Sequence, residues 1–258
     1  MDELSINRQQ LSQLRTIICV CMMGVGILSC SEKPDPQVII DKAIKKHGGE
    51  HYDNVLIAFD FRGRHYTILK KDTWFEYTRS FEDSLGKFKD VLNNDGFYRL
   101  LNGEKFNIPD TMAAKYARSV NSVAYFAMTP FVLNDEAVKK RYVGMCSLKD
   151  QKYHKIEISF EKVGGGEDYN DVFVYWINKD TYTMDYFAYA YEVDGGGTRF
   201  REIYNRRRVG DILFTDHVNY KYTSEDTPLS HYDQLYEDNQ LTKLSHINLE
   251  NVTVTPAD

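Results

Sequence analysis

Cysteine is scarce in this 258-residue chain, and three of its four cysteines lie close to the N-terminus. Cys19 and Cys21 lie inside an apolar run and Cys30 ends it, which leaves Cys146 alone in the later sequence. A single thiol supports neither an internal disulfide framework nor a cysteine metal site. We therefore expect Cys146 to be a small buried apolar residue, and we predict no cofactor.

The chain also lacks an excess of positive charge and the short motifs of common enzymes. Its formal net charge is -6, which disfavours general nucleic-acid binding. It contains neither Gly-x-Ser-x-Gly nor His-Glu-x-x-His. On strands, His154 and Glu157 would lie on opposite faces, and the adjacent Asp216 and His217 would point apart. The sequence therefore favours a protein that is not an enzyme.

No apolar run is long enough for a permanent membrane span. The longest covers residues 16–29, whereas a spanning helix needs about 20 residues. A run of this length suits a signal-peptide core. It ends in Ile27-Leu28-Ser29-Cys30, which resembles a bacterial lipobox and implies cleavage before Cys30 and lipid attachment to it. The alternatives are an ordinary secretory signal with an accidental cysteine, or a buried helix.

This interpretation defines the expected domains and location. Residues 1–30 are predicted to be a lipoprotein signal peptide, and residues 31–258 a single domain. The partner implied by Cys30 is a membrane, so we expect a lipid-anchored protein of the bacterial cell envelope, at the outer membrane. The sequence leaves the oligomeric state open.

What the sequence has in plenty is aromatic residues, which make up 14% of it. Aromatic and β-branched runs separated by Gly, Asn and Asp are typical of consecutive antiparallel strands. Such runs occupy residues 55–67, 74–79, 88–92, 97–101, 104–108, 153–162, 171–178, 185–193, 199–205, 212–222 and 246–254.

Three segments have helical character instead. Residues 34–49 carry an apolar stripe, and His47 near their end suits the negative end of the helix dipole. Asp110 is expected to cap a helix over residues 110–128, and residues 230–240 form a short amphipathic helix. Because no βαβ alternation occurs, we predict an α+β, mostly β fold: one large curved antiparallel sheet, a half-barrel, with helices packed on its concave side.

The chain after the signal resembles a domain-of-unknown-function family of Bacteroidota lipoproteins, across residues 34–254. The motifs that carry the resemblance are Lys46-His-Gly-Gly49, Phe59-Asp-Phe-Arg-Gly-Arg-His-Tyr66, Asp90-Val-Leu-Asn-Asn-Asp-Gly96, Ser119-Val-Asn-Ser-Val-Ala-Tyr-Phe126, Val172-Phe-Val-Tyr-Trp-Ile-Asn178 and Gly195-Gly-Gly-Thr-Arg-Phe-Arg-Glu202. In element order the chain is also similar to the LolA-like lipoprotein-localisation-factor group. That second resemblance implies a concave face that shelters acyl chains, whereas the first implies no activity.

Strand alternation selects candidate ligand-binding residues. The expected apolar lining consists of Phe59, Phe61, Trp74, Val172, Val174 and Trp176. Arg199 and Arg201 follow the second triple-glycine segment and would form a polar rim that binds an anionic head group. The alternative is a simple turn whose arginines pair across strands with the acids after the first triple glycine, Glu167, Asp168 and Asp171.

A second arginine pair lies in the first strand region. Alternation over residues 55–67 puts Arg62, Arg64 and Tyr66 on the face opposite Phe59 and Phe61. An arginine row can bind carboxylates or phosphates bidentately, or it can be a solvated outer face.

The best interpretation is a non-catalytic, membrane-anchored lipoprotein that binds a hydrophobic or amphipathic ligand, a lipid or acyl chain, in a curved-sheet cavity. One alternative is a surface lipoprotein that binds glycans or proteins on exposed Tyr and Trp. Another is a hydrolase, which a carboxylate or histidine pair inside the cavity would favour. The discriminating feature is whether the aromatic side chains are enclosed or flat and exposed.

Overall fold

The computed structural model describes residues 33–163, 169–192, 195–223 and 227–257. The chain divides into Met1–Lys33 and a second compact unit, Pro34–Asp258. The predicted signal peptide with Cys30, and Glu167 and Asp168, lie outside the described residues. Because Pro34–Asp258 is compact and has hydrophobic clusters of its own, it meets the structural requirement for folding alone.

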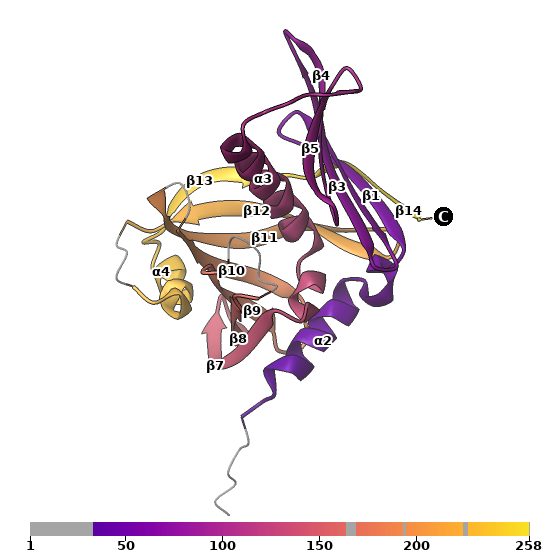
Figure 1. Ribbon diagram of the computed structural model, residues 1–258. Helices are drawn as coiled ribbons and strands as arrows, with labels where there is room; N and C mark the ends of the chain where they lie inside the picture. The colour runs from indigo at the N-terminus through magenta and orange to yellow at the C-terminus, as the bar shows by residue number, and fades with distance from the viewer. Residues whose placement is uncertain (1–32, 164–168, 193–194, 224–226, 258) are drawn as a thin grey trace, which may run out of the picture. The chain divides into compact units, whose positions relative to one another are not determined.

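The strands of this unit form two antiparallel sheets of seven strands each (Figure 1). Sheet 1 has the order β14-β1-β2-β3-β4-β5-β6, with β1 Val55–Phe61, β2 Arg64–Lys71, β3 Trp74–Asp83, β4 Gly86–Asn93, β5 Gly96–Leu101, β6 Glu104–Lys105 and β14 Glu250–Pro256. Sheet 2 has the order β13-β12-β11-β10-β9-β8-β7, with β7 Val138–Leu148, β8 Gln151–Phe160, β9 Val172–Asn178, β10 Met184–Tyr191, β11 Gly197–Val209, β12 Ile212–Lys221 and β13 Thr242–Ile247.

The helical segments cover both faces of sheet 2. They are α2 Pro36–His47, η1 Gly49–Tyr52, α3 Asp110–Met128, η2 Phe131–Asn134, η4 Leu229–His231 and α4 Tyr232–Glu237. The apolar stripe of α2 and two aromatic residues of α3 pack in one cluster against β8–β11. Tyr232 of α4 packs in a different cluster with Trp176 and Phe200. Asp110 is the first residue of α3 and makes no capping hydrogen bond, contrary to its predicted role.

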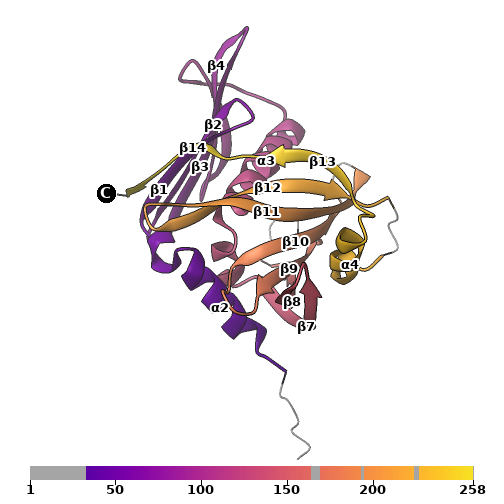
Figure 2. The same ribbon diagram turned by 180° about the vertical axis from the view of Figure 1, so that it is seen from behind.

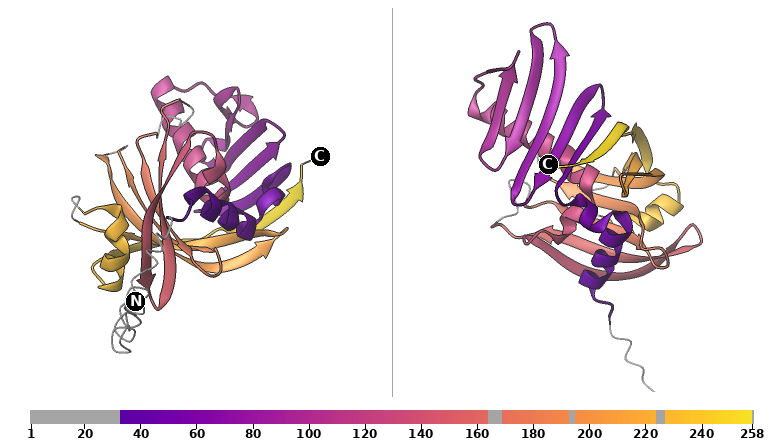
Figure 3. Two further views of the ribbon diagram at one scale, coloured as in Figure 1. Left: turned by 90° about the horizontal axis from the view of Figure 1, so that it is seen from below. Right: turned by 90° about the vertical axis from the view of Figure 1, so that its right-hand side faces the viewer.

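The predicted α+β, mostly β class is confirmed, and the strands are divided between two sheets rather than joined in one. Figure 3 shows sheet 2 curving around α2 and α3, as expected for helices on a concave side. The short helix α4 lies on the other face of sheet 2. The two apolar faces of β9 explain this arrangement, because a strand that is buried on both sides needs cover on both sides.

The region predicted as a single strand over residues 55–67 is a hairpin of β1 and β2. Arg62 and Gly63 form its two-residue turn, with φ of 51° and 68°. Two left-handed turn residues match the twist of a tight hairpin. Phe59 therefore pairs with Tyr66, and their rings stack at 5.6 Å between centroids, so the predicted assignment of these residues to opposite faces is wrong.

The predicted last strand is likewise two strands in two sheets. β13 pairs with β12 in sheet 2, and β14 pairs with β1 in sheet 1 (Figure 2). The chain crosses between the sheets at Asn248-Leu249. There the Leu249 N–H donates to Asp216 Oδ1 at 2.9 Å, and Arg207 donates to the Leu249 carbonyl oxygen. Asp216 therefore fixes the crossover, while its neighbour His217 points to the other face, as predicted.

His47 is not the helix-end cation that the sequence suggests. Its side chain is fully buried, and Nε2 accepts a hydrogen bond from the Met184 N–H at 3.1 Å. Burial, with the nearby charges of Arg206, Arg208 and Lys46, lowers the pKa of His47 to about 3. The imidazole is therefore neutral at physiological pH and acts as a buried acceptor.

We predict that His47 contributes a pH-dependent stability. Between pH 6.5 and 3 the unfolded chain binds a proton at His47 that the folded chain does not, so stability falls as the pH falls through this window. The expected loss is about 1.4 kcal/mol per pH unit. Urea unfolding at pH 6, 5 and 4 should show a shallower pH dependence for His47→Gln than for the wild type. Equal slopes would contradict the assignment.

A buried ion triad holds sheet 1 against α3. Asp90 is fully buried and accepts from Arg79 Nε at 2.9 Å and from Arg99 Nε at 2.5 Å. Arg79 also donates to Ser119 Oγ at 2.8 Å, and the Arg99 guanidinium lies 3.8 Å from the Tyr116 ring centroid. Two helical residues thus contact the two arginines, and the triad fixes how α3 lies on sheet 1.

We expect Asp90→Ala to destabilise the protein by about 3–5 kcal/mol, because it leaves two guanidinium groups buried without their carboxylate. The matched control is Glu157→Ala, which removes a carboxylate from the more exposed pair with Arg141 and should cost about 0–1 kcal/mol. Urea unfolding of both variants measures the difference. Similar losses in the two would show that the triad is not a stability determinant.

Candidate functional site

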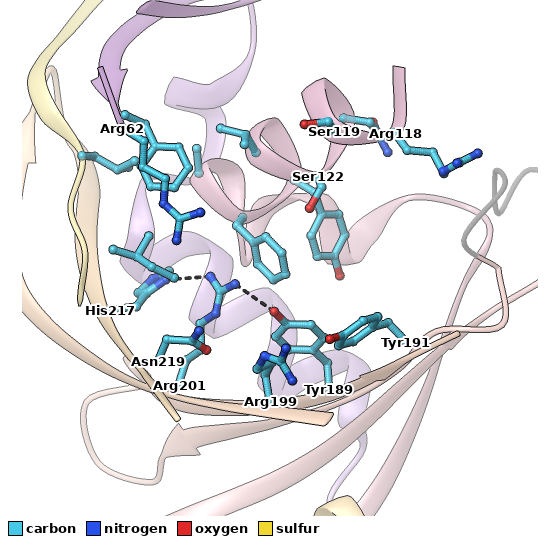
Figure 4. A pocket seen from close by; sticks show the side chains of 18 of the residues that line it. Arg62, Arg118, Ser119, Ser122, Tyr189, Tyr191, Arg199, Arg201, His217 and Asn219 are labelled. Atoms are coloured by element: carbon cyan, nitrogen blue, oxygen red, sulfur yellow. Dashed lines mark hydrogen bonds between the residues drawn. The ribbon is translucent and has the colours of Figure 1, made fainter. Parts of the chain in front are cut away.

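A cavity of about 940 Å³ lies between α3 and sheet 2. The turn end of the β1–β2 hairpin, one side of α3, and strands β8 to β13 supply its walls (Figure 4). Its volume is at the upper end of the range of about 300–1,000 Å³ that small-molecule sites occupy.

The helix α3 supplies the side of the cavity that faces sheet 2. Its lining residues recur at helical spacing through Lys115, Ser119, Ser122 and Phe126. A second stripe of the same helix, Val120, Ala124 and Met128, is buried. The polar residues of the first stripe are exposed and bound the cavity, whereas the second stripe packs in the core.

Aromatic side chains form much of the cavity wall. Phe126 lies 5.4 Å from the ring of Tyr189, and Phe173 lies 5.3 Å from the same ring, measured between centroids. The remaining aromatic lining residues are Phe61, Tyr66, Tyr125, Phe160 and Tyr191. Aromatic rings that line a concave cavity can bind apolar groups by removing them from water.

The cavity is also strongly cationic. Six of its described lining residues are basic and one, Asp171, is acidic; the basic residues are Arg62, Arg64, Lys115, Arg118, Arg199 and Arg201. Arg62 points into the cavity in Figure 4, and its guanidinium lies 5.0 Å from the Phe61 ring centroid. The combination of aromatic walls and excess positive charge suits a ligand that is both apolar and anionic.

Arg201 is the most deeply placed of these cations, with 8% of its surface exposed. Its Nη2 donates to the Tyr189 hydroxyl at 2.8 Å, and its Nη1 lies 3.4 Å from His217 Nδ1 (Figure 4). The guanidinium also lies 4.3 Å from the Phe126 ring centroid. Among the residues that the structure describes, no carboxylate forms an ion pair with Arg201.

His217 is a neutral partner of this arginine. A guanidinium has no acceptor, so His217 Nδ1 must accept from it, and Nε2–H then donates to Thr215 Oγ1 at 3.1 Å. Burial and the positive charge of Arg201 lower the pKa of His217 well below its usual value. A neutral histidine without a carboxylate neighbour is poorly suited to act as a base in a triad.

The structure brings three of the predicted site residues to this cavity: Phe61, Arg199 and Arg201. Phe59 is fully buried in a core cluster behind the hairpin, and Trp74 is 37% exposed at the start of β3. Val174 and Trp176 pack on the face of sheet 2 that α4 covers. By strand alternation, Val172 lies on the same face of β9 as Val174 and Trp176. Its neighbours Asp171 and Phe173 lie on the opposite face and line the cavity.

For the three residues of β9, Val172, Val174 and Trp176, the difference has one physical cause. Both faces of β9 are apolar, so alternation separates the two faces without showing which of them borders the cavity. Phe126, Tyr189 and His217, which sequence reasoning missed, come from three elements far apart in the chain. The helical spacing of Lys115, Ser119, Ser122 and Phe126 could have indicated which residues of α3 share a face and line the cavity. It carries no information about the strand residues that line the cavity.

In the described part of the chain, no group of three or more His, Cys, Asp or Glu residues is arranged to hold a metal ion. No described helix is both long and apolar enough to cross a membrane. Cys146 is half-buried, and burial raises the pKa of its thiol to about 12.

The fold and site define a two-sheet antiparallel protein with an aromatic, cationic cavity under a central helix. Residues 15–249 match a family of unknown function, DUF6503, and the chain belongs to this family. The predicted membership of a domain-of-unknown-function family is thus confirmed, while its restriction to Bacteroidota stays a prediction. No curated protein matches the sequence.

Solved structures with a similar arrangement have little sequence in common with the chain. A LolA superfamily protein from Nitrosomonas europaea is 10% identical, with a TM-score of 0.47, over 85% of this chain and 93% of that one. A DUF1329 family protein from Desulfovibrio piger is 10% identical, with a TM-score of 0.38 over the same shares. The lipoprotein LppX from Mycobacterium tuberculosis is 11% identical, with a TM-score of 0.26, over 63% of this chain and 91% of that one. The first of these structures belongs to the LolA superfamily, the group whose layout the sequence was predicted to share.

Proposed function

We propose that this protein binds an amphipathic ligand, a lipid or acyl chain, in the cavity between α3 and sheet 2, without catalysing a reaction. The observation that carries the proposal is the aromatic lining of a concave, half-open cavity of about 940 Å³. Each methylene that leaves water for such a wall contributes about 0.8 kcal/mol. The contribution therefore grows with the length of hydrocarbon chain that the cavity buries.

The placement of the aromatic residues favours this function over the rival glycan- or protein-binding one. A glycan platform needs flat, exposed rings, whereas Phe126, Phe173 and Tyr189 pack against one another in the wall of a concave cavity. Trp74 and Phe106 are exposed rings, but one lies at the start of β3 and the other after β6. The hydrolase alternative is disfavoured because His217 pairs with a cation.

The proposal includes anchoring of the protein in the bacterial cell envelope, at the outer membrane, through lipid on Cys30. Its support is the sequence Ile27-Leu28-Ser29-Cys30 and the short apolar run before it. Lipid on Cys30 would hold the cavity close to a membrane, which is a source of amphipathic molecules.

We expect native mass spectrometry of residues 31–258, purified without detergent, to show a bound mass of lipid size. Phe61→Asp places a charge on the cavity wall and should weaken uptake of the neutral probe N-phenyl-1-naphthylamine by about tenfold or more. Fluorescence titration of the probe measures this change. Phe106→Asp is the matched control, because Phe106 is 37% exposed and lies outside the cavity lining.

A chain that carries no bound mass and takes up neither the probe nor added lipids would contradict the proposal. Equal weakening by Phe61→Asp and Phe106→Asp would show that the probe binds elsewhere. Thermal unfolding of both variants checks that each is folded at the temperature of the titration.

A further inference from the structure

Arg201 is a charged group in a place where charge is costly. Its side chain is nine-tenths buried and borders the cavity, and its partners Tyr189 and His217 are neutral. Burial of an ionised group without a counter-ion is strongly unfavourable. The contact with the Phe126 ring offsets part of this cost through a cation–π interaction.

The contrast with the other buried arginines is informative. Arg79 and Arg99 share Asp90, which gives each of them a carboxylate within hydrogen-bond distance. Arg201 has an equally low exposed fraction and no such partner among the described residues. Its Nε also lacks a hydrogen-bond partner there. A negative charge that enters the cavity would supply what this arginine lacks.

The surrounding donors suit an anion as well. The Tyr189 hydroxyl oxygen accepts from Arg201, which leaves its own O–H free to donate. His217 uses Nδ1 as an acceptor for Arg201 and Nε2–H as a donor to Thr215, so it adds no charge. Arg201 is therefore the buried positive charge here, and Arg199, two residues away on the same strand, lines the same cavity.

We propose that the ligand is a long-chain carboxylic acid whose carboxylate pairs with Arg201 and Tyr189, with its hydrocarbon chain along Phe126 and Phe173. A carboxylate is planar, carries one negative charge and can accept two parallel hydrogen bonds from a guanidinium. A phosphate monoester carries about -1.5 to -2 at pH 7, so its transfer from water to a buried place costs more. This inference rests on the proposed function, because it specifies the ligand class of the same cavity.

The test compares three ligands with the same hydrocarbon chain. Hexadecanoic acid, hexadecan-1-ol and hexadecyl phosphate are titrated at pH 8 into residues 31–258 loaded with N-phenyl-1-naphthylamine, and loss of probe fluorescence is recorded. Hexadecanoic acid should displace the probe at a concentration about tenfold or more below that of the alcohol, because hydrogen bonds to charged groups are among the strong ones.

Substitutions locate the preference. Arg201→Met keeps an unbranched apolar stem and should abolish the preference for acid over alcohol while probe and alcohol still bind. Arg201→Lys keeps the charge and should retain part of the preference. Arg141→Met is the control, since Arg141 is exposed on β7 outside the cavity lining, and it should keep the full preference.

The outcomes separate this inference from the proposed function. If acid and alcohol displace the probe equally from the wild type, the carboxylate site is overturned and the cavity proposal stands. If hexadecyl phosphate is preferred to hexadecanoic acid, the assignment to a carboxylate is overturned. Absence of any probe uptake overturns both proposals. The wild-type comparison needs no substitution, so it decides the question even if Arg201→Met does not fold.

Discussion

The packing of α3 on both sheets is the constraint on which the cavity depends. One side of this helix is fixed to sheet 1 by the contacts of Tyr116 and Ser119 with the Arg79–Asp90–Arg99 triad. At its C-terminal end, Tyr125 donates to or accepts from Tyr175 at 3.1 Å, and Phe126 stacks with Phe187 at 5.7 Å between centroids. Between these two attachments α3 spans sheet 2 without filling the space beneath it. The cavity is that space.

The connection between the two sheets supports the same arrangement. The chain leaves sheet 2 after β13 and enters sheet 1 as β14, so neither sheet can turn independently of the other. Gly210, in the turn between β11 and β12, has φ of 55°, and a Cβ there would lie 2.7 Å from Val254 of β14. Glycine at this position thus allows the far end of the β11–β12 hairpin to contact sheet 1. The cavity lies on sheet 2 away from this contact, among the ends of β10, β11 and β12 that carry Tyr191, Arg199 and Asn219.

Local sequence signals predict the elements of this protein well and their faces poorly. The Gly, Asn and Asp turns correctly separate β8 to β12, because turn chemistry depends on the residues of the turn itself. Arg62-Gly63 was missed as a turn because arginine seldom adopts the left-handed conformation that it has there. The face assignment of Val174 and Trp176 failed for another reason. Helix α4, which covers them, is about 50 residues away in sequence, and nothing local to β9 indicates it.

The distribution of charge gives the cavity a character that the whole chain does not have. The protein carries a net charge of -6, yet the described cavity lining contains six basic residues and one acidic residue. A cavity with apolar walls concentrates the field of its charges more than an open surface does. If the ligand is the anionic amphiphile proposed above, the cavity lining attracts it, while the net charge of the rest of the chain is negative. Selection by charge would then precede contact, and the rings of Phe126, Phe173 and Tyr189 would select by apolar surface.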